Sequence, residues 1–318
     1  MIELRTADRK SPVLAPARLP CLAGMPTLSL TAGCAHGCVY CYAQGYCNHP
    51  GRDRVVLYAN LVERLREELA RKRRKPEAVF LSPASDPFQP LPEVLDLAWS
   101  VLELLFSQGI GVVFLTKGRI PKRHFELIEA HAPLVRAQIG IISVDRKLSR
   151  IFEPRAATPR VRLEQCRRLI AAGVATQARA DPILPGLTDD PDALHALCAA
   201  LAGAGVRELA ASTLFLRPPL VRILRNRLRR PKMLGRLTDA FQRGKWLALR
   251  PGQGSLFALA PARRQTIFDW LSAIARQYGI TVRVCGCKNP DLAAGGCNMA
   301  GQWSPPELVE RQLALFSG

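Results

Sequence analysis

Three cysteines close together near the start of the chain have the residue type and spacing of a metal site. They are Cys34, Cys38 and Cys41, in the segment TLSLTAGCAHGCVYCYAQGYC. Three thiolates on one short, glycine-containing loop can bind three irons of a [4Fe–4S] cluster, which leaves the fourth iron open to a further ligand. A zinc site is the alternative. Because structural zinc prefers four protein ligands, Cys47 or His36 would have to complete it.

A second set of cysteines lies in the segment VRVCGCKNPDLAAGGCNMAG, near the end of the chain. It consists of Cys285, Cys287 and Cys297. The glycines between them allow a loop to fold three thiolates around one centre, which predicts a second Fe–S cluster or a structural zinc. Three buried, reduced thiols without a metal are the remaining interpretation.

The 318-residue chain is strongly basic. It has 45 Lys and Arg against 26 Asp and Glu, a net charge of +19, and 36 of the basic residues are arginine. This balance attracts polyanions, either nucleic acid or acidic lipid, and it leans toward phosphate because a planar guanidinium binds phosphate through two hydrogen bonds. A hydrophobic content of 48% and a mean hydropathy of +0.03 exclude a disordered or membrane-spanning chain.

The N-terminal sequence MIELRTADRK mixes acidic and basic residues, whereas a signal peptide has a basic start followed by an apolar run. We therefore expect a cytoplasmic protein that does not interact with membranes. In that compartment the ten cysteines are expected to be reduced thiols or metal ligands rather than disulfides.

Short apolar runs alternate with amphipathic helical patterns along most of the chain. The predicted strands are Thr27–Ala32, Ala78–Ser82, Gly111–Thr116, Val135–Val144, Ala175–Asp181 and Arg207–Thr213. The helices between them include Asn60–Arg74, Glu93–Gln108 and Pro159–Ala172. Six such units predict an α/β fold with a parallel sheet, a partial (βα)6 barrel of the TIM type, with its chemistry at the C-terminal ends of the strands.

The pattern divides the chain into three parts: a proline-rich lead over residues 1–26, the partial barrel over 27–217 and a basic, cysteine-containing region over 218–318. The last part begins with an Arg-dense helical pattern, VRILRNRLRRPKMLGRL. A glycine-rich joint at Pro251–Gly254, a helix at Ala262–Tyr278 and a strand at Ile280–Val284 are expected to follow.

At the CxxxCxxC loop the chain resembles the radical S-adenosylmethionine superfamily. It is most similar to the branch that contains spore photoproduct lyase, over roughly residues 20–215. The resemblance implies that Cys34, Cys38 and Cys41 hold the cluster and that the open iron binds S-adenosylmethionine. Reductive cleavage of the sulfonium then gives a 5′-deoxyadenosyl radical, which abstracts hydrogen from a substrate.

Further residues match the branch in order along the chain. The resemblance implies that Tyr40 lies beside the adenine, and that Ser85 and Asp86 in VFLSPASDPFQP bind cofactor or substrate. It also implies that Lys117 in FLTKG approaches the carboxylate of S-adenosylmethionine and that Ser143 in IGIISVD approaches its ribose. A Ser or Asp after a strand is also a common helix cap, which is the alternative for each of them.

Glu153 and Arg155 in FEPR and Asp181 in RADPILPGLTD are further landmarks of the branch, and we count Arg155 among the cofactor-binding residues. One position departs from the pattern. Spore photoproduct lyase has a hydrogen-donating cysteine where this chain has Pro83, so the hydrogen-return step of that enzyme cannot run in the same way. Tyr42 matches the CxYCY loop, and it either serves a radical relay or simply packs under the loop.

The resemblance and the charge together predict radical chemistry on a nucleic acid in repair or modification, with DNA favoured over RNA. They also imply an electron donor such as flavodoxin or ferredoxin. Two alternatives are a small-molecule or peptide substrate, and a non-catalytic module that binds zinc and nucleic acid. The tail segment QLALF, Gln312–Phe316, resembles a sliding-clamp peptide, although it would also suit the inner face of a last helix.

Overall fold

The structure is a computed structural model that describes residues 1–17, 22, 25–248 and 255–292. Its centre is an eight-stranded sheet in which seven neighbouring strands run parallel. In spatial order these are β13 (Thr281–Val284), β10 (Glu208–Thr213), β9 (Ala175–Ile183), β8 (Val135–Gly140), β7 (Gly111–Thr116), β6 (Ala78–Leu81) and β3 (Pro26–Leu28). The short strand β2 (Ala15–Pro16) pairs antiparallel with β3 at the edge. Among the described strands β13 and β2 do not pair with each other, so the barrel is partial, as predicted.

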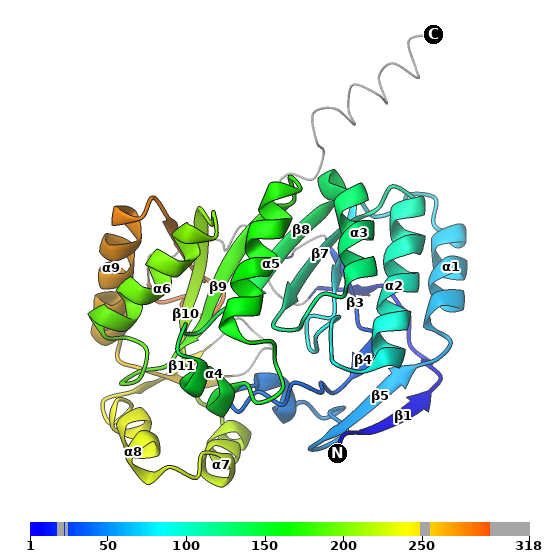
Figure 1. The fold of residues 1–318 in the computed structure, drawn as a ribbon. Coiled ribbons are helices and arrows are strands. Elements are labelled where there is room, and N and C mark those ends of the chain that lie inside the picture. Colours follow the sequence, from blue (N-terminus) through cyan, green and yellow to red (C-terminus); the bar gives the residue numbers. More distant parts are fainter. Residues whose placement is uncertain (18–21, 23–24, 249–254, 293–318) are drawn as a thin grey trace.

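Helices connect the strands and cover the outer face of the sheet (Figure 1). They are α1 (Leu61–Arg71), α2 (Pro92–Ser107), α3 (Lys122–Ala130), α4 (Arg146–Phe152), α5 (Pro159–Ala171), α6 (Pro191–Gly203) and α9 (Pro261–Gln277). Local sequence fixes where several of them begin. In α5 the hydroxyl of Thr158 accepts the N–H of Val161, and Pro159 takes the first helical position, where its missing N–H costs nothing.

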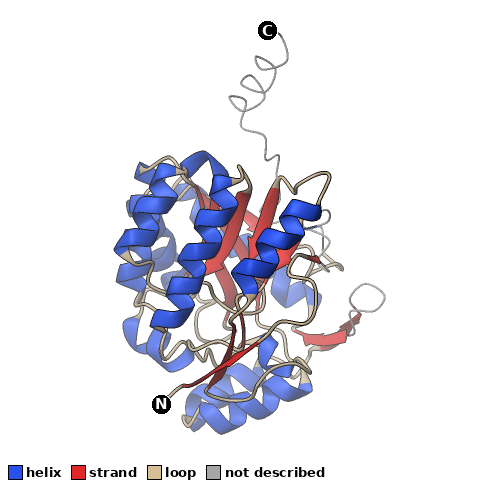
Figure 2. Cartoon of the chain, turned by 90° about the vertical axis from the view of Figure 1, so that its right-hand side faces the viewer, coloured by secondary structure: helices blue, strands red, loops and turns tan. Residues whose placement is uncertain are grey.

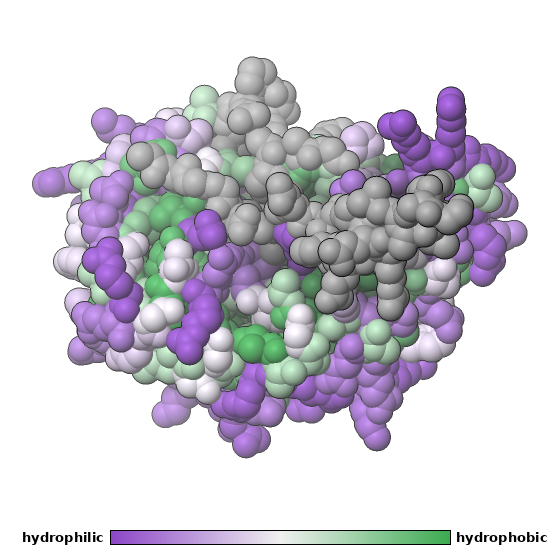
Figure 3. All heavy atoms as spheres, turned by 90° about the horizontal axis from the view of Figure 1, so that it is seen from above, coloured by the Kyte–Doolittle hydropathy of each residue, from purple (hydrophilic) through white to green (hydrophobic). Residues whose placement is uncertain are grey.

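The core lies between the sheet and these helices. Strand β7 is buried on both faces, and α2 turns an apolar face with Val101, Leu102 and Leu105 toward it. Such continuous burial is typical of a parallel sheet that is covered on both sides. Viewed from above, hydrophilic side chains occupy most of the rim of the molecule (Figure 3).

A second, three-stranded sheet holds the segment that contains Cys34, Cys38 and Cys41. It consists of β1 (Glu3–Ala7), β5 (Arg54–Tyr58) and β4 (Thr31–Ala32), with β5 in the middle. Because β4 and β5 pair antiparallel, residues 33–53 form a loop whose two ends are held side by side. We call these residues the cysteine loop. It lies at the lower end of the barrel in Figure 1, where the parallel strands end.

Two predicted strands differ from those observed. The run Thr27–Ala32 is split, because the chain leaves the main sheet after Leu28 and joins the small sheet at Thr31. Ser82 marks the crossing, since its N–H donates to Leu28 O at 2.6 Å. The run Val135–Val144 ends as a strand at Gly140, although Ile141 and Ile142 remain buried, so hydrophobicity alone overextended it.

The C-terminal region also differs in part from expectation. The Arg-dense stretch is two helices, α7 (Pro218–Arg227) and α8 (Pro231–Asp239), because Pro231 has no N–H to continue a helix and restricts the residue before it. An antiparallel ribbon follows, β11 (Lys245–Ala248) and β12 (Ser255–Ala258), seen at the right of Figure 2. The predicted last strand exists as β13, and it extends the main sheet beside β10, which the sequence did not indicate.

Among the described residues no helix is both long enough and apolar enough to cross a bilayer.

Candidate active site at the end of the barrel

The cysteine loop begins with a turn that requires glycine. Gly33 has a φ of +79°, and a Cβ at this position would lie 2.4 Å from the carbonyl oxygen of Arg54. An L-residue would therefore be strained and would also push the two ends of the loop apart. Glycine thus allows Cys34 to follow directly on the paired strands β4 and β5.

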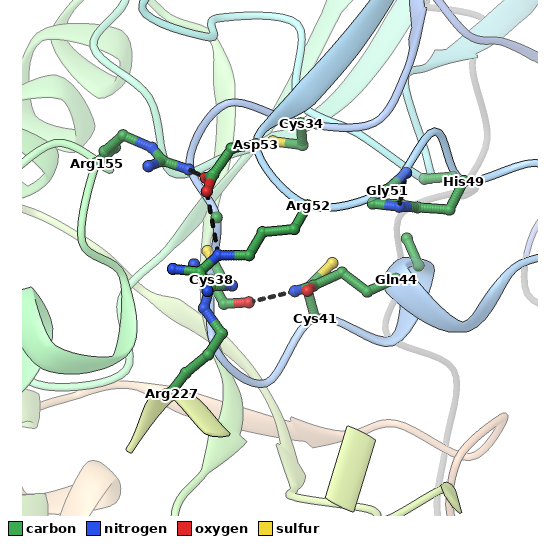
Figure 4. Close-up of a pocket in the computed structure, with 13 residues that line it drawn as sticks. Cys34, Cys38, Cys41, Gln44, His49, Gly51, Arg52, Asp53, Arg155 and Arg227 are labelled. Carbon is green, nitrogen blue, oxygen red and sulfur yellow. Dashed lines mark hydrogen bonds and ion pairs between the residues drawn. The ribbon is translucent and has the colours of Figure 1, made fainter. Parts of the chain in front are cut away.

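Cys34, Cys38 and Cys41 of the loop line one pocket, together with Gln44, Arg52, Asp53, Arg155 and Arg227 (Figure 4). Cys38 is buried, and Cys34 and Cys41 are partly buried. Burial raises the pKa of each thiol above the ordinary cysteine value. Thiolates in this pocket therefore need positive charge close by, which metal ions supply. Three cysteines facing one pocket, in an environment that disfavours free thiolates, fit an iron–sulfur cluster.

His36, between the first two cysteines, ties the loop to the barrel. Its Nε2 lies 3.2 Å from Oδ2 of Asp86, and its Nδ1 lies 3.2 Å from the carbonyl oxygen of Arg155. Asp86 also accepts hydrogen bonds from Thr116 Oγ1 at 2.7 Å and from the N–H of Lys117 at 2.8 Å. Although burial opposes it, His36 helps to lower the pKa of Asp86, which is ionised. These contacts make Asp86 a positioning residue; the cofactor contact inferred for it remains a prediction.

A buried ion pair supports the loop at Tyr40. The Tyr40 hydroxyl donates a hydrogen bond to Glu153, and Glu153 pairs with Arg162 of α5, whose side chain is fully buried. Arg162 also donates to Ser149 Oγ at 2.9 Å and to the carbonyl oxygen of Gly140. Because its carboxylate is fully enclosed by donors, Glu153 stays ionised, and Tyr40 is fixed between Cys38 and Cys41.

Arginines surround the rim of the pocket. Arg155 donates to Asp53 Oδ1 at 2.6 Å and to the carbonyl oxygen of Ala35, so it holds both arms of the cysteine loop. Arg52 bonds the same carboxylate at 3.1 Å, and Arg227 reaches the pocket from α7. Burial and the like charge of Arg52 lower the pKa of Arg227. With one carboxylate for three guanidinium groups, the rim carries excess positive charge.

Three residues suited to an organic cofactor follow the ends of β6, β7 and β8, at the end of the barrel where the cysteine loop lies. The ammonium of Lys117 lies 5.8 Å from the centre of the Tyr40 ring, and no hydrogen bond joins it to a described residue. The hydroxyl of Ser85 is buried and has no hydrogen-bond partner in the described part of the chain. Ser143 accepts the N–H of Asp145 at 3.0 Å and keeps its own proton to donate. A free cation and two available hydroxyls fit a carboxylate and a ribose.

The sequence matches the Radical SAM superfamily over residues 28–198, where SAM stands for S-adenosylmethionine. This span contains the three cysteines and the parallel strands from β6 to β9. The chain belongs to the radical SAM superfamily. It is therefore a radical SAM enzyme, and the family implies a [4Fe–4S] cluster and S-adenosylmethionine as cofactors. The predicted superfamily is confirmed.

Several similar proteins are known. An uncharacterized protein of Mycobacterium tuberculosis is 30% identical over 317 residues, which cover 94% of this chain and 85% of that protein. The Radical SAM Nalpha-GlyT isomerase of Pseudomonas phage M6 is 25% identical over 163 residues, or 51% of this chain and 34% of that protein. Spore photoproduct lyase complexed with dinucleoside spore photoproduct has a TM-score of 0.67 at 18% identity, covering 88% of this chain and 81% of its own. This last likeness shows that the fold is shared.

Tyr42, which follows Cys41, and Asp181 lie near each other at the end of the barrel that holds the cysteine loop, which we call the barrel mouth. The Tyr42 hydroxyl donates to the carbonyl oxygen of Pro83 at 2.9 Å, and 41% of the residue is exposed. Asp181, at the end of β9, pairs with Arg179 at 2.7 Å and with Lys288 at 2.6 Å. Although burial opposes it, Lys288 and Arg179 lower the pKa of Asp181 far below its ordinary value. Lys288 also lies 5.8 Å from the centre of the Tyr42 ring.

The second cysteine set is described only in part. Cys285 is buried and Cys287 is partly buried, in the loop after β13, whereas Cys297 lies outside the described residues. Arg264 of α9 holds this loop through hydrogen bonds to Asn289 and Asp291, both at 2.9 Å. The second metal centre stays a prediction.

Sequence reasoning missed several residues that position the site. The sequence suggested His36 only as the fourth ligand of a zinc ion. In the structure its ring contacts Asp86 and does not line the cysteine pocket. Arg162 was overlooked because one arginine inside an amphipathic helix gives no signal of its own. Gln89, in the segment SDPFQP, donates to Thr31 and accepts the N–H of Ala35 at 2.7 Å. The only signal in the sequence was that Gln89 lies within the segment matched to the branch.

Proposed function

We propose that this radical SAM enzyme starts radical chemistry on a nucleic acid, in repair or modification, with DNA favoured over RNA. The observation that carries the proposal is the position of the basic helix α7. It packs against the short 3₁₀ helix of the cysteine loop, Tyr42–Gly45, so that a Cβ on Gly45 would lie 3.4 Å from Pro219. Arg227 thereby reaches the cysteine pocket, while Arg222 and Arg225 remain exposed beside it.

Charge supports a polyanionic substrate at this end of the barrel. Residues 218–248 contain nine Lys and Arg and a single Asp. Exposed arginines that follow a phosphate backbone release counterions and steer a nucleic acid toward the barrel mouth. The spore photoproduct lyase with the same fold is complexed with a dinucleoside, which agrees with this substrate class.

In the proposed mechanism Cys34, Cys38 and Cys41 hold the cluster. Lys117 binds the carboxylate of S-adenosylmethionine, while Ser143 and Ser85 hydrogen-bond to its polar groups. When bound, the cluster and S-adenosylmethionine would supply radical chemistry that begins with reductive cleavage of the sulfonium. The protein keeps the cysteine loop rigid through Asp86, Glu153 and Arg155, and the barrel excludes water from the reacting atoms.

The residue after Ser82 is Pro83 and not a cysteine, so it cannot return a hydrogen atom to the substrate radical. Another residue must do so. Tyr42 is the proposed catalytic residue, since its hydroxyl is held at the carbonyl of Pro83 and its ring is open to the barrel mouth. The reaction is therefore expected to differ from that of spore photoproduct lyase.

The test is an anaerobic turnover with reductant and S-adenosylmethionine, in which 5′-deoxyadenosine is measured with DNA, with RNA and without polymer. Stimulation by one polymer supports the proposal, and equal rates in all three would contradict it. A variant with Arg222→Gln and Arg225→Gln should lose the stimulation and lower the salt dependence of binding by about two phosphate contacts. The control is Arg73→Gln with Arg74→Gln, because these exposed residues precede β6 at the opposite end of the barrel.

Three further proposals concern the cofactors and partners. Cys285, Cys287 and Cys297 bind a second Fe–S cluster or zinc, and an electron donor such as flavodoxin or ferredoxin reduces the first cluster in the cytoplasm.

The segment Gln312–Phe316, which lies outside the described residues, binds a sliding clamp. A peptide that ends in QLALFSG should bind purified clamp, and the Phe316→Ala peptide should bind far more weakly, because the ring is expected to fill the apolar pocket.

A further inference from the structure

The ribbon β11–β12 carries the most exposed tryptophan of the described residues. Trp246 is 61% exposed, although a large aromatic ring is usually well covered in a folded protein. The ribbon projects from the body of the molecule at the right of Figure 2. An indole held out in solvent on a regular element is available to stack on a partner.

The ring of Trp246 is held in place by two further aromatic rings. Trp246 lies directly across the ribbon from Phe257, with ring centres 5.5 Å apart. Phe257 in turn stacks on the buried ring of Phe241, at 6.2 Å. Gly244 permits this packing, because a Cβ there would lie 2.6 Å from the Phe257 ring. The three rings therefore form a row from the core to the solvent, and Trp246 is fixed at its outer end.

The ribbon is anchored at the end of the barrel that holds the cysteine loop. Leu216 and Phe257 exchange two backbone hydrogen bonds, each of 2.8 Å. Leu216 follows the end of β10 at Thr213 and precedes α7, which packs on the cysteine loop. The root of the ribbon is therefore close in sequence and in space to the basic helix beside the cysteine pocket.

The segment that leads to Trp246 is basic, and its charge matches one class of partner. Lys245 precedes Trp246 on β11, Arg243 lies two residues before β11 begins, and both are exposed. Arg236 and Lys232 on the preceding helix α8 are exposed as well. Aromatic rings flanked by exposed basic side chains are typical of surfaces that bind single-stranded nucleic acid, because the cations follow the backbone while the rings stack on bases.

We propose that the ribbon β11–β12 is a base-stacking element, on which Trp246 stacks against a base of a single-stranded segment of the substrate. This inference rests on the proposed function, since it specifies the form of the nucleic acid. A base inside an intact duplex is already stacked on its neighbours and cannot cover an indole face, whereas a base of a single strand can. The ribbon therefore selects single-stranded or locally opened nucleic acid.

The experiment measures the affinity of the purified full-length protein for fluorescein-labelled oligonucleotides by fluorescence anisotropy. The probes are one mixed sequence as single-stranded DNA, as single-stranded RNA and as duplex DNA, each over a series of salt concentrations. The variants are Trp246→Ala, Trp246→Phe and, as the matched control, Trp270→Ala. Trp270 is also exposed, at 40%, but it lies on α9.

We expect Trp246→Ala to weaken the binding of a single strand by about 5- to 150-fold, the usual effect of losing one aromatic stacking partner. Trp246→Phe should restore much of that affinity, and Trp270→Ala should bind like the wild type. The slope of affinity against salt should stay the same in Trp246→Ala, because stacking releases no counterions. Comparison of the DNA and RNA strands identifies which of the two is preferred.

Two results would overturn the inference while leaving the proposed function intact. One is a wild-type protein that binds a single strand no more tightly than the Trp246→Ala variant. The other is a reduced salt slope in Trp246→Ala, which would mean that the change acts through the basic residues of the ribbon. A wild-type protein that binds none of the three probes would instead remove the nucleic-acid substrate itself, and this inference with it.

Discussion

The two cysteine-containing loops of the molecule, residues 33–53 and 285–292, both have closely spaced cysteines with glycine between them and differ in what holds them. In the first loop the contacts to the barrel are made by residues between the cysteines, as in the pairing of His36 with Asp86 and of Tyr40 with Glu153. The thiols themselves are left to face a common pocket. In the second loop the described contacts lie between Cys287 and Cys297, where an arginine of α9, Arg264, bonds Asn289 and Asp291.

This difference determines what each loop offers to a ligand. In the first loop, these contacts leave three sulfurs facing the pocket, and arginine side chains surround the rim of that pocket. The described part of the second loop instead directs Lys288 to Asp181 at the barrel mouth. A set of cysteines is therefore a strong sign of a metal site when its thiols line one common pocket, as Cys34, Cys38 and Cys41 do. The following predictions test this distinction.

The largest effect is expected from replacing Cys34, Cys38 and Cys41 by alanine together. A methyl group cannot bind iron, so this variant should lose the first cluster and all cleavage of S-adenosylmethionine. Release of 5′-deoxyadenosine under anaerobic conditions is the measurement. The matched control replaces Cys166 and Cys198, which are buried on α5 and α6, and it should remain active. Cleavage by the triple variant would refute the assignment of the first loop.

The second prediction separates the two loops by their metal content. If Cys285, Cys287 and Cys297 bind a cluster, the triple variant of the first loop should still contain about four irons per chain. Elemental analysis of the anaerobically purified protein gives the answer. Zinc in place of iron would make the second loop a structural site, and the absence of both metals would leave it as reduced thiols.

The contrast between the loops also shows what could be predicted from sequence. The βα alternation located the parallel strands, because a buried strand in such a sheet is a short, continuous apolar run. It could not show that β13 would join them or that Thr31 would leave for a second sheet, since both depend on pairing between distant segments. Pro231 was a local signal that should have divided the Arg-dense helix.

The site was predictable to the extent that its residues form contiguous motifs. The cysteines, Ser85, Lys117 and Ser143 could be proposed from the sequence because each lies in a short segment after a strand, and their roles stay predictions. The ion pair between Glu153 and Arg162 is different, because its partners are joined by burial and not by a motif. Sequence can name a ligand, but it seldom identifies the side chain that holds that ligand in place.

The third prediction concerns this ion pair. Glu153→Gln leaves Arg162 buried without its counter-charge, so the free energy of unfolding should fall by about 3–5 kcal/mol. Denaturant unfolding, followed by circular dichroism, is the measurement. The control is Glu164→Gln on α5, the helix that carries Arg162, which breaks only an exposed pair with Arg167 and should cost less than about 1 kcal/mol.

The same pair gives the stability a defined pH dependence. Although burial opposes it, Arg162 lowers the pKa of Glu153 below its ordinary value of 4.5. The pair therefore contributes fully above that value and is lost as the pH falls through the lowered pKa. The wild type should lose stability below about pH 4.5 more steeply than Glu153→Gln. Equal slopes for the two proteins would contradict the assignment.

The smallest effects are expected at the two residues beside the cysteine pocket that are assigned to S-adenosylmethionine. Lys117→Ala removes a charge-assisted contact and should weaken binding by about 1.5–3 kcal/mol. Ser143→Ala removes a neutral hydrogen bond and should cost about 0.5–1.5 kcal/mol. Affinity measured by equilibrium dialysis should follow this order, with the iron content unchanged because neither side chain belongs to the cysteine loop. Lys122→Ala, an exposed lysine paired with Glu126 on α3, is the control. If both variants bind the cofactor like the wild type, the free ammonium of Lys117 serves the substrate or the cluster and not S-adenosylmethionine.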